Sequence, residues 1–316
     1  MREDIPEIIL KSKQEEWLNV LFVNSPIISM ISRMMIDSYC LESKNILLIS
    51  FRNTDTKILG LNSININYQR NERLLDKLLY TSIKGNQILK EIKKYKKNFL
   101  LFASSSFREV NWLLKNNNCK GHIYIEEGRA AYTKWNLYDI NKLSLTDKLI
   151  MNWRNKMYKT EGDGFFYRND AKAFIGISKD SFAFANSNIR FLLSNFDDLK
   201  KYYIPYHLNI VNIGLTCADN KIEEKNWIKM FETLADAMGY IGVIKLHPSF
   251  YSVISKRDKI IKAFKSLNFR NIELSPNGSI LELEMIYEKK KLFGPRSSLK
   301  RYANVFKSKY IDTNFS

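Results

Sequence analysis

Short apolar runs that alternate with amphipathic segments constrain the fold of this chain more than any other feature. Strand-like runs of the first half lie at 17–23, 45–51, near 64–68, 98–104 and 121–128, and helical patterns lie at 26–39, 72–95 and 106–116. In the second half, strand-like runs lie at 208–216, 240–247, 271–274 and 291–294, and helical patterns at 225–238, 252–267, 279–289 and 297–306. This alternation is typical of βαβ units in a mostly parallel sheet. The sequence therefore predicts an α/β fold.

The alternation of strand-like and helical segments occurs twice along the chain, which predicts two domains. Between them the pattern loosens: 159–166 is typical of a loop, 172–184 of a strand or a pair of strands, and 196–207 of a linker. We predict two Rossmann-like domains, 1–200 and 201–316, that face each other across a cleft, with the last helix packing back on the first domain. In such folds ligands lie at the carboxyl ends of strands.

Composition limits the class of protein. The 316 residues are 45% hydrophobic and 13% aromatic, which is enough for packed cores. The three cysteines are scattered and odd in number, so neither a disulfide framework nor a zinc site is expected. The chain start has no signal-peptide pattern, and no apolar stretch reaches the 18 residues of a membrane span. We expect a cytoplasmic protein.

The formal net charge of +17 predicts an anionic partner. Nucleic acid, anionic lipid and acidic small molecules all fit such an excess. The lysine-rich runs at 90–98 and 287–292 are equally typical of solvated helix faces. Helix-turn-helix, zinc-finger and RNP motifs are absent from the sequence, and basic residues form no single stripe. Nucleic acid is therefore not the expected partner, although a basic nucleic-acid-binding protein remains the alternative from another class.

The first polar group at a predicted strand end is Glu126, Glu127 and Gly128. Burial of the first acid against the sheet edge would raise its pKa and suit it to general-base catalysis. The glycine allows a tight turn into the next element. The alternative is a pair of surface glutamates that cap the following helix, where the helix dipole favours negative charge.

The second group ends the strand at 240–247. Pro248 suits a helix start, so it ends the strand and directs His247 into the crevice. A histidine there can donate to a phosphate and protonate a leaving group. Lys245 alternates with Leu246, which places it on the face of His247 as electrostatic support. The alternative is a hydrogen-bonded structural histidine, the role that we assign to His122 and His207.

The third group is Ser297 and Ser298, which open a helix after Gly294 and Pro295. Two hydroxyls beside free amides at a helix start form an anion site, and a capping serine is the alternative. The preceding helix carries Glu282 and Glu284. Because they are two residues apart, they face different sides, and at most one enters the cleft.

In this order, E-E-G (126–128), K-x-H-P (245–248) and S-S (297–298) resemble the motifs of the bacterial GT-B sialyltransferases. That family includes lipooligosaccharide sialyltransferases and capsule polysialyltransferases. Tyr132 matches the E-E-G-x-x-x-Y spacing of the polysialyltransferase-like members, and 20–36 is similar to their first strand and helix. Glu284 matches their helix glutamate, but the family's nearby proline is missing, so Glu282 stays open as its alternative. The stretch 145–190 matches nothing in the family.

The resemblance implies an inverting, metal-independent transfer of sialic acid from CMP-sialic acid to a hydroxyl of a capsule or lipooligosaccharide glycan, with no cofactor. It implies that Glu126 is the base, that Glu127 and Gly128 support it, and that the first domain binds the acceptor. In the second domain, His247 and the serines stabilise the departing phosphate, and Glu284 binds the ribose. The CMP-binding set is Lys245, His247, Pro248, Glu284, Ser297 and Ser298. Another CMP-activated ulosonic acid, such as Kdo or a pseudaminic-type sugar, is the alternative donor.

Such enzymes work at the inner face of the cytoplasmic membrane, often on lipid-linked glycans. The resemblance thus implies a peripheral membrane protein. Basic residues at 93–97 and 297–310 are the expected contacts with anionic lipid. An anionic, sialylated acceptor would be attracted by the same charge.

Overall fold

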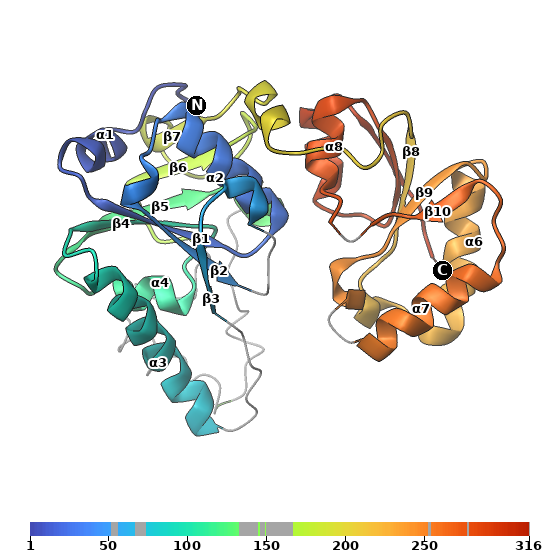
Figure 1. Ribbon diagram of the computed structural model, residues 1–316, viewed down its shortest axis with the longest axis horizontal. Coiled ribbons are helices and arrows are strands. Elements are labelled where there is room, and N and C mark those ends of the chain that lie inside the picture. The colour runs from blue at the N-terminus through green and yellow to red at the C-terminus, as the bar shows by residue number, and fades with distance from the viewer. Residues whose placement is uncertain are drawn as a thin grey trace. The chain divides into compact units, whose positions relative to one another are not determined.

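The computed structural model describes residues 1–51, 56–66, 74–132, 145, 149, 167–251, 254–276 and 278–315. The chain divides into two compact units, Met1–Leu199 and Lys200–Ser316 (Figure 1). The boundary expected from the sequence lies between 200 and 201. Within the described residues, no helix combines the length and the apolar character that crossing a bilayer requires.

Unit 1 is built on a parallel sheet in which the described strands follow the order β3-β2-β1-β4-β5-β6-β7. Its strands are β1 (Leu18–Val23), β2 (Ile46–Phe51), β3 (Ser63–Ile66), β4 (Phe99–Ala103), β5 (Cys119–Ile125), β6 (Ala173–Gly176) and β7 (Arg190–Leu192). Its helices are α1 (Glu7–Gln14), α2 (Pro26–Ser38), α3 (Leu74–Lys93) and α4 (Arg108–Leu113). β1, β2 and β4 are buried along their whole length, as strands covered on both faces must be.

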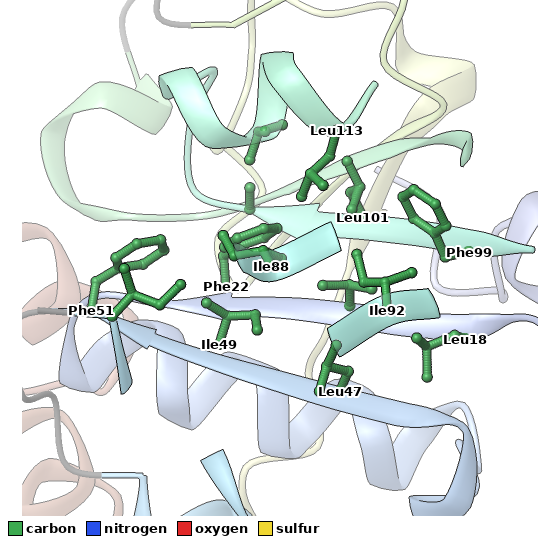
Figure 2. Packing of buried hydrophobic residues seen from close by; sticks show 14 residues of the cluster. Leu18, Phe22, Leu47, Ile49, Phe51, Ile88, Ile92, Phe99, Leu101 and Leu113 are labelled. Carbon is green, nitrogen blue, oxygen red and sulfur yellow. The ribbon is translucent and has the colours of Figure 1, made fainter. Parts of the chain in front are cut away.

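One face of this sheet forms a core with α3 and α4 (Figure 2). Leu18, Val20 and Phe22 alternate along β1 and so share that face. Phe22 stacks on Phe51 with ring centroids 5.8 Å apart. None of the residues of this core comes from α2, which contacts β1 and β5 and therefore covers the opposite face.

Unit 2 repeats the plan with a parallel sheet ordered β10-β9-β8-β11-β12. Its strands are β8 (Asn212–Leu215), β9 (Gly242–Lys245), β10 (Ile272–Leu274), β11 (Lys291–Gly294) and β12 (Lys309–Asp312). Its helices are α6 (Trp227–Ala237), α7 (Ile254–Ser266), α8 (Leu281–Tyr287) and α9 (Leu299–Val305). Helices α6 and α7 build one core against the sheet. In both units the first strand lies inside the sheet and the order reverses beside it, which is the Rossmann arrangement.

Among the α-helices and strands that the structure describes, α1, β7 and β12 were missed by the sequence analysis. Strand β7 has three residues, and β12 has no fully buried residue, so neither carries the apolar run of an interior strand. The predicted strand at 172–184 ends at Gly176 and is followed by turns. The loop predicted at 159–166 lies outside the described residues. The last helix, α9, packs against β12 and α8 inside unit 2.

Replacing Phe22 with alanine should destabilise unit 1 by about 3–5 kcal/mol, because it leaves a cavity between two aromatic neighbours. Phe22 is 1% exposed. Ile83→Ala is the control, since Ile83 is 60% exposed on α3 and its loss should change stability by less than about 0.5 kcal/mol. Urea unfolding of both variants measures this, and equal losses would contradict the assigned core.

Candidate functional site

The E-E-G, H-P and S-S residues lie at the carboxyl edges of the two sheets. Ligands of doubly wound sheets bind at this edge, where the strand order reverses. In unit 1 the order reverses between β1 and β4, and in unit 2 between β8 and β11. Glu126 follows β5 in unit 1, whereas His247 and Ser297 follow β9 and β11 in unit 2. The acid and the histidine–serine set thus belong to different units.

Glu126 is completely buried, and both of its carboxylate oxygens accept hydrogen bonds. Oε1 accepts from the Tyr132 hydroxyl at 2.5 Å, and Oε2 accepts from the Ser181 hydroxyl at 2.5 Å and the Ile177 amide at 2.7 Å. Burial raises the pKa of the Glu126 carboxyl, and the bonds from Ser181, Tyr132 and Ile177 oppose that rise. The predicted burial is therefore present, but the carboxylate faces protein donors.

The surroundings of Glu126 give a physical reason for the glycines at positions 128 and 176. Gly128 has a φ of 54°, a left-handed conformation that glycine adopts without strain. It opens the single turn, 128–132, that returns the Tyr132 hydroxyl to Glu126. A Cβ on Gly176, at the end of β6, would lie 2.8 Å from Glu126 Oε2, so the carboxylate fills the space that a side chain would need.

Glu127 is the half-buried acid of this edge. Its Oε2 accepts from Asn24 Nδ2 at 3.1 Å, and the same amide donates to the Ser104 hydroxyl at 3.2 Å. Asn24 follows β1 and Ser104 follows β4, so the two residues flank the point where the strand order reverses. The sequence analysis did not single out Asn24 or Ser104. The available signal was a small polar residue directly after each buried strand.

His247 is held at the end of β9 by its neighbours. Its amide donates to Thr216 Oγ1 at 2.8 Å, directly after β8, and Pro248 opens a short turn of helix as predicted. The Ser249 amide donates to His247 Nδ1 at 3.2 Å, so the neutral ring carries its proton on Nε2. Partial desolvation of the ring lowers the pKa of His247, and the negative charge of Asp219 opposes this shift. His247 can thus present an Nε2 proton to an anion.

Lys245 points to the loop after β10. Its Nζ donates to the Ser279 carbonyl at 2.6 Å and to the Ser279 hydroxyl at 2.9 Å. Burial lowers the pKa of Lys245 to about 8, while Glu282 and Glu284 oppose that shift. Burial also raises the pKa of Glu282, which Lys245 lowers in turn. The sequence analysis did not predict that the charges of Glu282 and Glu284 on α8 act on Lys245.

Ser297 and Ser298 precede α9, which begins at Leu299. Ser297 Oγ accepts from the Leu299 amide at 3.2 Å and lies 3.2 Å from the Tyr310 hydroxyl. The first contact is what a capping serine makes. Gly294, at the end of β11, packs against Leu215 of β8, since an added Cβ would lie 2.7 Å from that side chain. The serine pair therefore lies beside the strand-order reversal of unit 2, and its binding of a phosphate stays a prediction.

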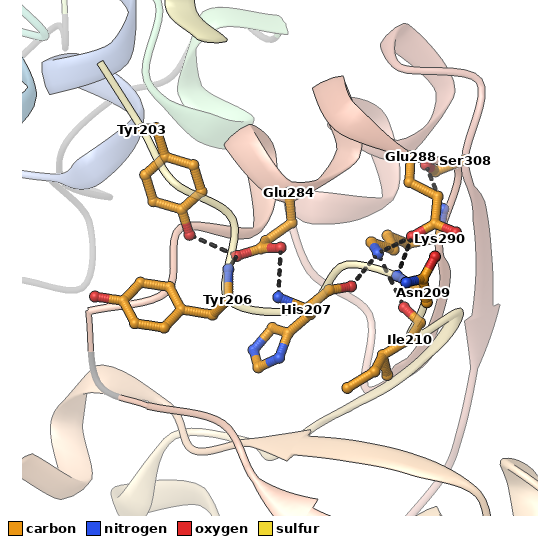
Figure 3. A network of polar contacts seen from close by, with 9 residues as sticks. All are labelled: Tyr203, Tyr206, His207, Asn209, Ile210, Glu284, Glu288, Lys290 and Ser308. Atoms are coloured by element: carbon orange, nitrogen blue, oxygen red, sulfur yellow. Dashed lines mark hydrogen bonds and ion pairs between the residues drawn. The ribbon is translucent and has the colours of Figure 1, made fainter. Parts of the chain in front are cut away.

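Glu284 anchors the segment that opens unit 2 (Figure 3). It is 1% exposed and accepts from the Tyr203 hydroxyl at 2.6 Å and from the Tyr206 and His207 amides at 2.9 and 3.2 Å. These contacts give the carboxylate a structural role. A contact with ribose, for Glu284 or for Glu282, stays a prediction.

The other two histidines are buried. His122 packs edge-to-face on Tyr124 with centroids 4.9 Å apart, and burial lowers its pKa to about 4. His207 Nε2 lies 2.9 Å from the Ser275 hydroxyl. In the part of the chain that the structure describes, His, Cys, Asp and Glu side chains form no group of three suited to a metal ion.

Comparison with known proteins found similarity in fold. No protein-family model matches it, and no curated protein matches it significantly. Among solved structures, S. aureus MnaA in its UDP co-structure matches with a TM-score of 0.56 and 11% identity, covering 94% of this chain and 79% of that chain. UDP-N-acetylglucosamine 2-epimerase from Rickettsia bellii matches with a TM-score of 0.50 and 9% identity, at the same coverages.

A sialyltransferase from Photobacterium damsela also matches, with a TM-score of 0.46 and 10% identity, covering 90% of this chain and 71% of that chain. At these identities a likeness shows the fold alone. The first two structures have the GT-B-type fold, and the predicted α/β class with two Rossmann-like units is confirmed.

Tyr132→Phe removes one donor from the buried Glu126 carboxylate and should cost about 1–3 kcal/mol of unfolding free energy. Because the pKa of Glu126 is raised on folding, stability falls as the pH rises from the ordinary carboxyl pKa through the folded one. The hydrogen bond from Tyr132 stabilises the ionised Glu126 carboxylate more than the protonated acid. The variant should therefore lose more stability at a pH above the folded pKa of Glu126 than at a pH below the ordinary carboxyl pKa. Urea unfolding measured at one pH below this window and one above it tests this, with Tyr95→Phe, an exposed tyrosine just after α3, as control. The same loss at both pH values would contradict it.

Proposed function

We propose that this protein is a glycosyltransferase that moves sialic acid from CMP-sialic acid to a hydroxyl of a bacterial surface glycan. One observation carries the proposal. The residues that resemble the sialyltransferase motifs follow β5, β9 and β11, at the carboxyl edges of two Rossmann-like sheets. That edge is where such sheets bind nucleotides and their sugars.

Unit 2 has the chemistry for the donor. The leaving CMP gains negative charge on its phosphate as the glycosidic bond breaks. His247 can stabilise that charge through Nε2 and donate a proton to it, because Nδ1 is already an acceptor for Ser249. Lys245 adds a positive charge two residues earlier on the same strand end. The chemistry proposed here requires no metal ion.

Unit 1 has the chemistry for the acceptor. A carboxylate must take the proton of the attacking hydroxyl, and the sequence favoured Glu126. Glu126 is fully enclosed and accepts from three protein donors, whereas Glu127 is half-buried and is oriented by Asn24. We therefore assign the proton transfer to Glu127 and the positioning of the 126–132 turn to Glu126.

The activity test is release of CMP from CMP-sialic acid in the presence of candidate glycan acceptors, with the product linkage read by NMR. CMP-Kdo and a CMP-pseudaminic-type donor separate the alternative ulosonic acids. UDP-N-acetylglucosamine tests a second candidate, a UDP-sugar enzyme, which the fold likeness to a UDP co-structure favours. Turnover of the UDP-sugar without turnover of any CMP-sugar would overturn the proposal.

The assignment of roles is tested by matched amide variants. Glu127→Gln should lower kcat about 10²–10⁴-fold, because it removes the proton acceptor. His247→Asn should give a loss of similar size through the leaving group. Glu126→Gln keeps the shape of the buried side chain and should lower activity less than Glu127→Gln. If Glu126→Gln is the more damaging variant while its melting temperature is unchanged, Glu126 is the base.

Lys245 makes the donor affinity pH-dependent. Below its pKa of about 8 the ammonium attracts the phosphate, and this attraction is lost as the pH rises above that value. Affinity for CMP, measured by calorimetry across pH about 6.5–9.5, should therefore fall through this range. Lys245→Arg keeps its charge and should flatten the profile, whereas Lys245→Met should bind CMP roughly tenfold more weakly at neutral pH.

Unfolding does not account for such a fall. The pKa of Lys245 is lowered on folding, so between about 8 and the ordinary lysine value the unfolded state binds more protons. Stability therefore rises with pH in that window. A CMP affinity that stays constant through pH about 8 in the wild type would remove Lys245 from the donor site.

A further inference from the structure

The edge of the unit 2 sheet that lies opposite the candidate donor site exposes large apolar side chains. This amino edge consists of the residues just before β8, β9, β10, β11 and β12. Four large apolar residues on it are exposed: Leu208 (54%), Val211 (41%), Tyr240 (53%) and Ile241 (61%). Side chains of this size are exposed singly on many proteins, but here they gather on one edge.

Hydrogen bonds join the amino ends of neighbouring strands along this edge. Asn212 Nδ2, next to Val211, donates to the Ile241 carbonyl at 3.2 Å. The Gly242 amide donates to the Asn271 carbonyl at 3.0 Å, and the Lys291 amide donates to the Val211 carbonyl at 2.8 Å. The Tyr240 ring lies 6.3 Å from the ring of Phe269. Val211 and Ile241 therefore precede neighbouring strands on this edge, and together with Leu208 and Tyr240, which lie close to them in the chain, they make up the apolar strip.

The loop that carries Leu208 is held rigidly (Figure 3). Lys290 is 2% exposed, and its Nζ donates to the His207 carbonyl at 2.6 Å, the Ile210 carbonyl at 2.9 Å and Glu288 at 2.7 Å. Glu288 also accepts from the Asn209 amide at 3.0 Å. A fixed loop with an exposed leucine at its turn presents that side chain to a partner at little entropic cost.

Cations flank the strip on the same edge. Five exposed basic residues precede or begin strands there: Arg270, Lys289, Lys291, Lys307 and Lys309. Exposed acids nearby are Asp236 in the last turn of α6 and Glu273 in β10, whereas Glu288 is paired with Lys290. The edge thus combines apolar side chains with an excess of positive charge.

Helix dipoles account for only part of this arrangement. Helices of a parallel α/β sheet end at the amino edge of the strands, where their carbonyl ends favour cations such as Lys289 and Lys307. The dipoles give no reason for Leu208, Val211, Tyr240 and Ile241 to be exposed. Apolar side chains inside a rim of cations are the arrangement that an interfacial membrane protein uses.

We propose that the amino edge of the unit 2 sheet binds an anionic lipid bilayer, with the strip 208–211 and 240–241 inserted at the headgroup level. The flanking cations contact lipid phosphates. Of the basic segments that the sequence favoured, this surface leaves out 93–97 and shares only Lys307 and Lys309 with 297–310. In those segments, Lys94 pairs with Glu91, Lys97 with Glu16 and Lys300 with Asp312.

This orientation has a consequence for access. His247, Ser297 and Lys245 lie at the carboxyl edge of the same sheet, so a bilayer on the amino edge leaves the candidate donor edge open to water. The inference does not depend on which nucleotide sugar the site takes.

The experiment is cosedimentation of the full chain with vesicles of phosphatidylglycerol and phosphatidylcholine, compared with vesicles of phosphatidylcholine alone. Binding to the anionic vesicles should be stronger and should fall with added salt. Ile241→Ser combined with Tyr240→Ser should weaken binding about tenfold, because it removes two inserted side chains. Lys289→Glu combined with Lys307→Glu should weaken it at low salt. The apolar double variant and the lysine double variant test the surface independently. If one of them does not fold, the other still gives a result.

Two controls match these variants. Ile228→Ser removes an apolar residue with 44% exposure at the start of α6, and Lys262→Glu reverses an exposed charge on α7. Neither control should change vesicle binding. Melting temperatures check that every variant folds.

Three results would overturn the inference. Unchanged vesicle binding by both folded pairs would exclude this edge as the contact. Concentration-dependent dimers, abolished by the Tyr240 and Ile241 substitutions, would show that a second copy of the chain covers the strip. Binding of DNA or RNA that depends on the lysines, without vesicle binding, would show that the cations serve a nucleic acid.

Discussion

The burial of the central strands on both faces is the constraint on which the candidate site depends. β1, β2 and β4 of unit 1 have no exposed residue, and in unit 2 helices α6 and α7 pack on the sheet. A buried polar group needs a partner, so ionisable side chains occur where a strand meets a loop. This places Glu126 and Glu127 after β5 and His247 after β9.

Much of the fold could be predicted from the sequence, since interior parallel strands and their helices carry strong patterns. The elements that were missed, such as β7 and β12, are short and carry no continuous apolar run, so local sequence offers little to detect. The strand ends with E-E-G, H-P and S-S were also predictable, since each follows an apolar run.

The partners of those residues were not predictable, because they come from distant parts of the chain. Ser181 and Ile177 reach Glu126 through the pairing of β5 with β6, and Asn24 reaches Glu127 across β4. The same holds for Glu284, whose partners lie about 80 positions earlier. Such contacts decide whether a carboxylate is enclosed or open. This is why the sequence favoured Glu126 as the base, whereas we propose Glu127.

Glu284 and Lys290, two buried charged residues of unit 2, depend on partners that precede its first strand. Glu284 is satisfied by Tyr203 and the amides of Tyr206 and His207, and Lys290 by the carbonyls of His207 and Ile210. All of these groups precede the first strand, β8. A shortened polypeptide that starts with β8 would lose these hydrogen bonds to Glu284 and Lys290, each worth about 1.5–3 kcal/mol because one partner is charged. A piece of the chain that keeps these contacts must therefore extend back to Tyr203, ahead of the first strand of the unit.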